Sequence, residues 1–161
     1  MTAIVELEPR TDEQALQYLE QLWPRYREEL IRSGASDAEA DANIGRNQQA
    51  IAPDGVLSPG QFMFRVLKDG QHIGNLWLCQ RDDKGDWFIY DIEVFEQHQG
   101  QGLGRATMQL AEEYARSHGA TRLGLSVFGF NNVARALYES LGYSIVAMGM
   151  TKDLGQDAPA G

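Results

Sequence analysis

Residues 99–105 read Gln-Gly-Gln-Gly-Leu-Gly-Arg and place three alternating glycines between a run of β type and a run of helical type. The run before them, 87–95, is rich in aromatic and β-branched residues, and the run after them, 106–118, repeats apolar residues at helical spacing. Glycine leaves backbone N–H groups unobstructed, and a following helix directs its positive end toward whatever they bind. The stretch therefore predicts a cradle for a phosphate or a pyrophosphate.

Spacing excludes two other phosphate-binding glycine patterns. The dinucleotide fingerprint G-x-G-x-x-G needs a glycine at Arg105 or Thr107, and a P-loop needs a Gly-Lys pair, which the sequence lacks. What remains is Q-x-x-G-x-G, with Gln99, Gly102 and Gly104 in the fixed positions. This pattern resembles the acetyl-CoA signature of the GNAT superfamily of N-acetyltransferases.

A second motif lies one helix and one strand further along the chain. Residues 131–143 read N-x-x-A-x-x-L-Y-x-x-x-G-Y, which is similar to the second motif of the same superfamily. Either motif alone can arise by chance, whereas both in this order and at this separation are far more specific. Together they span Tyr90 to Tyr143, and the sequence before Trp87 carries no signature of the superfamily.

The resemblance implies an α/β fold, α+β in some schemes: a mixed, mostly antiparallel sheet of six to seven strands flanked by about four helices. It also implies acetyl-CoA as the acyl donor, paired with a strand and held by the glycine loop, with a backbone N–H near Val94 for the oxyanion. Beyond its backbone, Arg105 either adds charge to this site or is solvated. The cofactor-binding residues that the resemblance implies are Ile92, Glu93, Val94, Gln99, Gly100, Gln101, Gly102, Leu103, Gly104, Arg105, Asn131 and Tyr138.

Acyl transfer from a thioester needs a neutral amine, a donor to the oxyanion and a proton for the departing thiolate. Tyr138 matches the tyrosine with which the superfamily supplies that proton. A phenol with an ordinary pKa near 10 is protonated at neutral pH and suits this catalytic role. The alternative interpretation of Tyr138 is a core tyrosine on an apolar helix face.

The general base is less well defined by the sequence. Some members of the superfamily carry a glutamate five residues before the asparagine, where this chain has Ser126. A serine cannot deprotonate an ammonium ion, so this role falls to another residue or to a chain of water molecules. Asp91 and Glu93 are two residues apart in one predicted strand, so their side chains should point to the same face of the sheet. There they either line the substrate pocket or lie as charges at the sheet edge or the pocket rim without a catalytic role. Glu93 is the preferred catalytic base because it is nearer the glycine loop, and His98 is a further candidate.

The amino-acid composition limits the number of domains and the kinds of binding partner that can be expected. A single domain over residues 1–154 is expected, with a flexible tail at 155–161, since 161 residues at 43% hydrophobic can form one core. A formal charge of −9 argues against nucleic-acid and anionic-membrane partners. It favours an amine-bearing, cationic substrate, unless the acidity serves solubility alone. The resemblance also allows a homodimer, because members of the superfamily often pair.

Neither a metal nor a targeting segment is expected. No histidine or cysteine cluster has metal-ligand spacing, and the single Cys79 lies in an apolar run as an inert buried thiol. The first ten residues lack the pattern of a signal peptide, and no apolar run is long enough to span a membrane. A cytoplasmic location is therefore expected.

Capping boxes and apolar periodicity predict the elements. Helices should start near Thr11 and Ser36, with Pro24 kinking or ending the first, and further helices should occupy 106–118 and follow Asn131. The predicted strands are residues 62–66, 73–79, 87–95, 122–128 and 143–150. On the first helix, Trp23, Tyr26 and Glu29 either line an acceptor pocket or pack the helix on the sheet.

Three functions are compatible with these motifs. The first is acetyl transfer from acetyl-CoA to a primary amine of a small molecule or protein, by direct attack in a ternary complex and without an acetyl-enzyme. The second uses a different acyl-CoA on the same scaffold. The third is a catalytically silent module that binds acetyl-CoA as a sensor.

Overall fold

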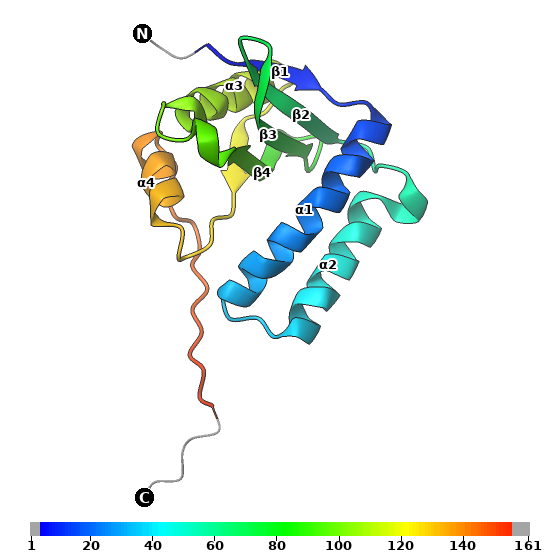
Figure 1. Cartoon of the computed structure of the whole chain (residues 1–161), viewed down its shortest axis with the longest axis vertical. Helices are drawn as coiled ribbons and strands as arrows, with labels where there is room; N and C mark the ends of the chain where they lie inside the picture. The colour runs from blue at the N-terminus through cyan, green and yellow to red at the C-terminus, as the bar shows by residue number, and fades with distance from the viewer. Residues whose placement is uncertain (1–3, 156–161) are drawn as a thin grey trace, which may run out of the picture.

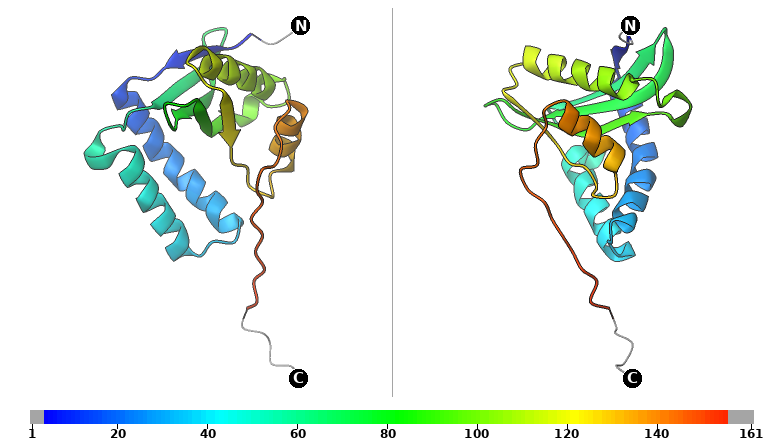
Figure 2. Two further views of the ribbon diagram at one scale, coloured as in Figure 1. Left: turned by 180° about the vertical axis from the view of Figure 1, so that it is seen from behind. Right: turned by 90° about the vertical axis from the view of Figure 1, so that its left-hand side faces the viewer.

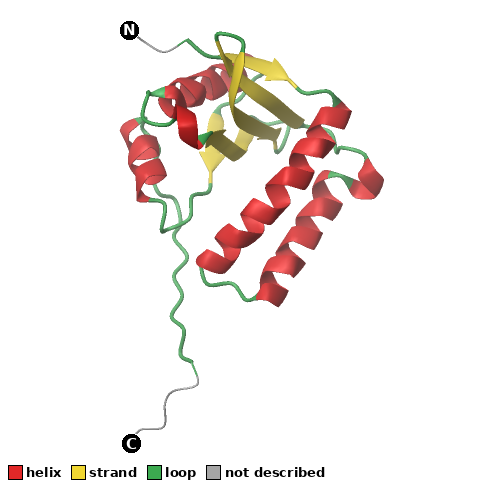
Figure 3. Ribbon diagram, viewed as in Figure 1, coloured by secondary structure: helices red, strands yellow, loops and turns green. Residues whose placement is uncertain are grey.

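The computed structural model describes residues 4–155, so the predicted tail lies outside the described residues except for Gly155. A five-stranded sheet in the order β1-β2-β3-β4-β5 runs through the molecule (Figures 1 and 3). Its strands are β1 (Glu6–Pro9), β2 (Gln61–Lys68), β3 (Gln71–Gln80), β4 (Asp86–Val94) and β5 (Arg122–Leu125). The helices are α1 (Asp12–Arg32), α2 (Asp37–Ile51), α3 (Leu103–Ser117) and α4 (Asn132–Ser140), with short 3₁₀ turns η1 (Pro53–Gly55) and η2 (Glu96–His98).

The connections explain why the sheet is mixed. Strands β1 to β4 pair antiparallel, and β5 joins β4 in parallel. Asp69 and Gly70 have φ values of 52° and 77°, the positive values that a tight hairpin turn between β2 and β3 requires. A parallel partner needs a crossover, which α3 provides between β4 and β5. The predicted mixed, mostly antiparallel sheet is confirmed, with five strands in the described chain rather than six or seven.

Each face of the sheet is covered by helices. Leu76 and Leu78 of β3 belong to the core beneath α3, whereas the intervening Trp77 belongs to a second core beneath α1. This alternation is what a strand buried on both faces requires. Figure 2 shows α3 on one side of the sheet and the α1–α2 pair on the other. The α1–α2 pair therefore forms a wall that faces one side of β4 and β5.

The helix starts predicted at Thr11, Ser36 and Asn131 are confirmed, whereas α3 begins at Leu103 rather than at residue 106. Thr11 and Ser36 form capping boxes at the starts of α1 and α2, and Asn131 caps α4. Pro24 lies inside α1, which continues through it as one helix. In residues 4–155, no helix is both long and apolar enough to cross a membrane.

The expected final strand over residues 143–150 is wrong for this structure. Tyr143 is tied to the body, because its N–H donates to Tyr138 O at 3.0 Å and its hydroxyl to Glu112 Oε2 at 3.2 Å. Residues 144–150 are all exposed, have no backbone hydrogen bond within the described chain, and extend away from the sheet (Figures 1 and 2). Their apolar alternation favours a strand, but no neighbouring strand or core of the same chain covers them.

Candidate active site

A β-bulge in β4 decides which side chains face α1. Asp91 pairs with Trp77 of β3, whereas Ile89 pairs with the next β3 residue, so Tyr90 is an extra residue in the ladder. Such an insertion reverses the alternation of side chains beyond it. Ile89 therefore lies in the core under α3, while Asp91 turns to the other face, where its Oδ2 lies 2.9 Å from Arg25 Nη2.

Beyond the bulge, β4 has lost its contact with β5. Pairing with β5 covers Asp86–Ile89 and stops there. Residues 91–94 keep their β3 partners on one side, while their other edge meets no strand of the described chain. Gln99 Nε2 donates to Val94 O at 2.9 Å at the end of this gap. The gap exposes a strand edge where an extended ligand can add backbone-type hydrogen bonds.

The glycine loop leads from this gap into α3. Gly100 and Gly102 have φ values of 78° and 76°, which other residues adopt only with strain. Gly104 is helical, and a Cβ there would lie 3.4 Å from Leu137 Cδ2 of α4. The first two glycines therefore set the loop conformation, whereas a Cβ at Gly104 would make an ordinary contact with α4.

The start of α3 lacks the side-chain cap that the other three described α-helices have. Its N-cap is Gly102, which offers no side chain to the backbone donors. The N–H groups of residues 103–105 have no acceptor among residues 4–155. Lys68, at the end of β2, adds a cation nearby, with its Nζ 3.5 Å from Gln101 Oε1. Free amides, a helix N-terminus and a lysine together favour an anionic ligand.

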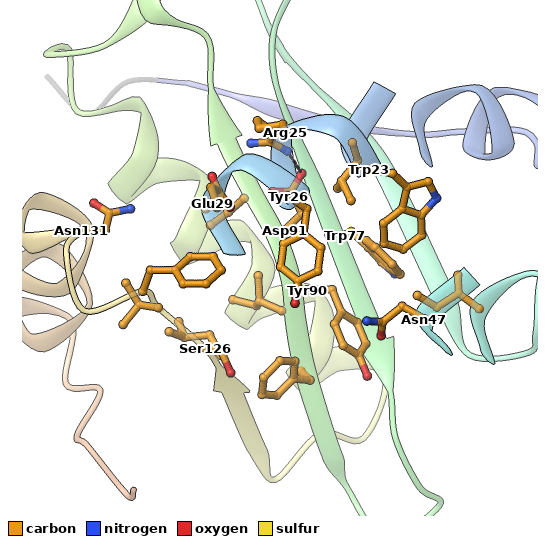
Figure 4. A pocket seen from close by; sticks show the side chains of 18 of the residues that line it. Trp23, Arg25, Tyr26, Glu29, Asn47, Trp77, Tyr90, Asp91, Ser126 and Asn131 are labelled. Carbon is orange, nitrogen blue, oxygen red and sulfur yellow. Dashed lines mark hydrogen bonds and ion pairs between the residues drawn. The ribbon is translucent and has the colours of Figure 1, made fainter. Parts of the chain in front are cut away.

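A cavity of about 370 Å³ lies between the α1–α2 wall and the diverging strands (Figure 4). It reaches from Asn47 on α2 to Asn131 and Tyr138 at α4, and its volume suits a small molecule. Trp23, Tyr26 and Glu29 all line it, as one of the two sequence-based interpretations expected. The aromatic lining residues are Trp23, Tyr26, Trp77, Phe88, Tyr90, Phe128, Phe130 and Tyr138.

Arg25 of α1 binds two carboxylates at the edge of this cavity. Asp91 accepts hydrogen bonds from Arg25 and from the Tyr18 hydroxyl. Burial raises the pKa of Asp91, although Arg25 and Tyr18 oppose the rise. Glu93 Oε2 lies 3.5 Å from Arg25 Nη1 and accepts from Asn75 Nδ2 at 2.9 Å. Both carboxylates are therefore held in place by partners from the protein itself.

Glu29 is different, because its carboxylate lines the cavity without a hydrogen bond or ion pair to any other described residue. It lies one helical turn after Arg25 on α1 (Figure 4). Burial raises the pKa of Glu29, Arg25 opposes this, and the carboxylates of Asp91 and Glu93 add to the rise. A half-buried carboxylate among aromatic rings can hold an ammonium ion and can take its proton.

Tyr138 and Asn131 lie at the α4 end of the cavity. Burial, with a contribution from the Asp91 carboxylate, raises the pKa of Tyr138 to about 12. Its ring packs against Tyr143 in an edge-on arrangement with centroids 6.2 Å apart. Asn131 Oδ1 accepts the Ala134 N–H at 3.2 Å, so its Nδ2 is the group left for a ligand.

Comparison with known proteins identifies the family. Residues 15–143 match the acetyltransferase (GNAT) family. The chain belongs to this family. The uncharacterized N-acetyltransferase YdgE of Bacillus subtilis is 30% identical over 152 residues, which cover 92% of this chain and 97% of YdgE. The crystal structure of the Bacillus subtilis acetyltransferase YycN matches with a TM-score of 0.83 at 27% identity, covering 94% of this chain and 99% of that chain.

The two GNAT motifs meet where α3 packs against α4. Besides the contact of Gly104 with Leu137, Arg105 Nη2 donates to Ser140 Oγ at 2.7 Å. The Arg105 side chain therefore joins the two helices, and its backbone N–H is the group that is free at the loop. Tyr138 follows directly after Leu137, so the same packing sets the distance between the glycine loop and the phenol.

The candidate bases occupy different places in the GNAT fold. Asp91 and Glu93 share a face, as predicted, and Asp91 lines the cavity, whereas Glu93 is not among the lining residues. Ser126 lines the cavity just beyond the end of β5. His98 lies in η2 outside the cavity, and its Nε2 is buried without a partner in the described chain.

Two features of this site were missed from the sequence. Lys68 reaches the glycine loop from a hairpin 33 residues away, and no local pattern connects them. The bulge at Tyr90 had a signal, because the aliphatic core positions change from odd to even numbers between Ile89 and Ile92. That change indicates one extra residue between them.

Proposed function

We propose that this GNAT protein transfers the acetyl group of acetyl-CoA to a primary amine bound in the aromatic cavity, by direct attack in a ternary complex. The observation that carries the proposal is that one cavity connects Glu29, a carboxylate without a protein partner, to Tyr138 of the second GNAT motif. Family membership and the N-acetyltransferase names of YdgE and YycN support the reaction type.

The residues present fit acetyl-CoA. The free N–H groups of residues 103–105 and the cation of Lys68 suit its pyrophosphate. The unpaired edge of residues 92–94 and the Asn131 amide suit the two amide groups of its pantetheine arm. When bound, acetyl-CoA supplies the acetyl group as a thioester and leaves as a thiol.

The acceptor side suits an amine on an apolar or aromatic body. Eight aromatic side chains offer ring faces and edges to such a body, and a cation also binds favourably over ring faces. Glu29 supplies the one negative charge in the cavity that no protein cation neutralises directly. These features support a small cationic amine as the acceptor.

The groups at the two ends of the cavity indicate where the protons lie during the reaction. The Glu29 carboxylate takes the proton of the bound ammonium, because only a neutral amine is nucleophilic. Tyr138 Oη stays protonated at neutral pH, since its pKa is about 12, and donates a hydrogen bond to negative charge on the sulfur. Glu93 remains the competing candidate for the base, and separate replacement of the two glutamates decides between them.

The experiment that tests this proposal is thiol release from acetyl-CoA with a panel of aromatic, aliphatic and polycationic amines. We expect turnover with primary amines on aromatic or alkyl bodies and a slower reaction with polycations. Binding of acetyl-CoA without thiol release for any amine contradicts the proposal and indicates a silent sensor. A faster reaction with a longer acyl-CoA contradicts the choice of acetyl as the donor group.

A further inference from the structure

Four charged side chains line the cavity: Arg25, Glu29, Arg81 and Asp91. Arg25 and Asp91 bind each other, and Arg25 also binds Glu93. The side chains of Glu29 and Arg81 form no ion pair with any residue between 4 and 155. The cavity therefore holds one carboxylate and one guanidinium without a partner in the described chain. The proposed reaction uses the carboxylate, and it gives no role to Arg81.

Arg81 directly follows β3, and its side chain is held against aromatic rings of β4. Its backbone N–H donates to Asp86 O at 2.9 Å, which fixes the chain at the start of the turn. The exposed guanidinium has its central carbon 3.6 Å from the centroid of the Phe88 ring and 5.7 Å from that of Tyr90. A guanidinium stacks favourably on such rings while its N–H groups remain available for an anion. The rings therefore position Arg81 as a cation at the open side of the cavity.

Two acidic residues of the turn between β3 and β4 have other partners. Asp86 Oδ1 lies 3.4 Å from Arg122 Nε. Asp82 Oδ1 accepts the backbone N–H groups of residues 84 and 86, each at 2.9 Å, and these bonds lower the pKa of Asp82. Neither carboxylate pairs with Arg81, so the guanidinium is left for an anion from outside the described chain.

The two charges without partners are separated along β4. Phe88, under the Arg81 guanidinium, and Asp91 have β3 partners that are two residues apart. These two β4 side chains are therefore roughly 7 Å apart along the sheet. Figure 4 shows Glu29 on the side of Asp91 away from Tyr90. This separation is too large for the amine and carboxylate of an α-amino acid, which share one carbon atom.

We propose that Arg81 binds a carboxylate of the acceptor, so that the substrate class is a primary amine with a carboxylate at the far end of an aromatic or alkyl body. The amine lies at Glu29, and the carboxylate accepts hydrogen bonds from Arg81. One guanidinium balances the single charge of a carboxylate, whereas a phosphate ester carries close to two charges at pH 7. The position of the amine rests on the proposed function, whereas the contact with Arg81 is a binding contact that forms with or without turnover.

Arg81 also affects how other amines fit the cavity. An ammonium group in place of the carboxylate is repelled, because like charges lie close together. A neutral group at the same position is neither attracted nor repelled. Acceptors should therefore rank with the carboxylate first, the neutral group second and the second ammonium last, which gives the slower reaction of polycations a physical cause.

The first test compares three acceptors that differ only at the group facing Arg81: 4-(aminomethyl)benzoate, 4-(aminomethyl)benzamide and 1,4-bis(aminomethyl)benzene. Thiol release from acetyl-CoA gives kcat/KM for each. We expect the benzoate to exceed the benzamide about tenfold and the diamine to be slowest. In Arg81→Met the ratio of benzoate to benzamide should fall to about one.

Lys84→Met is the matched control, because Lys84 is an exposed cation of the same turn that does not line the cavity. This variant should keep the ratio of the wild-type chain. Equal kcat/KM values for benzoate and benzamide in the wild-type chain overturn the proposal. A ratio that Arg81→Met leaves unchanged overturns it as well.

A binding measurement separates the Arg81 site from the proposed reaction. Trp23 and Trp77 line the cavity, so quenching of tryptophan fluorescence reports acceptor binding without acetyl-CoA. The benzoate should bind about tenfold more tightly than the benzamide, and Arg81→Met should remove this difference. If the difference is found but no amine releases thiol, the Arg81 site is supported and the proposed reaction is wrong. If amines react but benzoate and benzamide bind equally, the Arg81 site is overturned, and tighter binding of phenylalanine than of the benzoate overturns the assigned separation.

Discussion

The donor end and the acceptor end of the candidate site are built from different parts of the chain. At the donor end, in the glycine loop, the binding groups are the backbone amides of residues 103–105, exposed because Gly102 provides no cap. At the acceptor end they are side chains, with Glu29 as the carboxylate that has no protein partner. The donor end depends on backbone conformation over a few consecutive residues, and the acceptor end on the packing of several separate elements.

This difference explains what each end recognises. Backbone amides at a helix start suit any phosphate, so the same short motif serves one donor on many scaffolds. A cavity of aromatic side chains depends on which residues α1, α2 and the loop after β5 present, so it changes with each substitution. Substitutions that alter the backbone conformation of the glycine loop should therefore weaken donor binding. Substitutions of single side chains in the cavity should instead weaken the binding or the reaction of the acceptor.

The largest expected effect is on donor binding. Gly102→Val forces a β-branched residue into a φ of 76°, which disturbs the amides of residues 103–105. We expect acetyl-CoA affinity to fall roughly 100-fold, equivalent to losing two charge-assisted hydrogen bonds at about 1.5 kcal/mol each. Isothermal titration calorimetry measures this loss.

Gly119→Val is the matched control, because Gly119 follows the other end of α3 with a φ of 91° and equally open surroundings. Both variants should lose similar stability, about 1–3 kcal/mol for the strained residue. If the two variants bind acetyl-CoA equally well, the glycine loop is not the donor site.

The next effect separates chemistry from binding at Tyr138. Tyr138→Phe removes the hydroxyl and keeps the ring, so kcat should fall about 100-fold while the Kd for acetyl-CoA changes less than about twofold. Tyr143→Phe is the control, since Tyr143 also has a buried ring and a raised pKa but hydrogen-bonds Glu112 outside the cavity. Equal kcat values for the two variants in steady-state assays argue against a catalytic role for the Tyr138 hydroxyl.

A smaller effect is expected at the acceptor end. Glu29→Gln should lower kcat/KM for the amine about 30-fold, equivalent to about 2 kcal/mol for one charged interaction. Glu28→Gln, on the exposed neighbouring position, should leave the rate unchanged. If Glu93→Gln has the larger effect, Glu93 is the base and Glu29 has a binding role at most.

The pH dependence of kcat/KM gives a second test of the role of Glu29. Its folded pKa is raised, and the ionised form takes the proton, so kcat/KM should fall on the acidic side at a pH above the ordinary glutamate value of about 4.3. That acidic limb should disappear in Glu29→Gln. A raised pKa also means that Glu29 loses its contribution to stability as pH rises through that pKa, so Glu29→Gln should not lower the melting temperature at pH 7.

The smallest effect is expected at Cys79, which is buried in β3 next to β4 and does not line the cavity. Burial raises the pKa of Cys79, so the thiol stays protonated and is a poor nucleophile. Cys79→Ala should keep kcat within about twofold, and a large loss speaks for an acetyl-enzyme.

Sequence alone predicted the parts of the fold that short patterns encode. The capping boxes at Thr11 and Ser36 and the helix start after Asn131 are all present as predicted. β1 was missed, because a four-residue strand with two glutamates and a proline has no apolar alternation. The strand over 143–150 was predicted from its apolar residues, which report the tendency of a segment and not whether its own chain offers a partner.

In the candidate site, too, the sequence predicted only the features that consecutive residues determine. The glycine loop was read from consecutive residues, since its conformation is local. The free carboxylate of Glu29 was not identified as a base, because its freedom depends on Arg25 being paired with Asp91 and Glu93 of β4, and Asp91 is 66 residues further along the chain than Arg25. No pattern within α1 reports that competition.

Because of the bulge at Tyr90, the orientation of the side chains in β4 depends on the number of residues in the strand and not on which residue occupies position 90. A substitution at this position alters one side chain of the cavity wall, whereas deletion of it turns Asp91 and Glu93 into the core and Ile92 and Val94 out toward α1. Loops on either side can lengthen or shorten during evolution without this inversion. In β4, a substitution therefore changes one side chain, whereas the gain or loss of a residue reverses the orientation of every side chain beyond it.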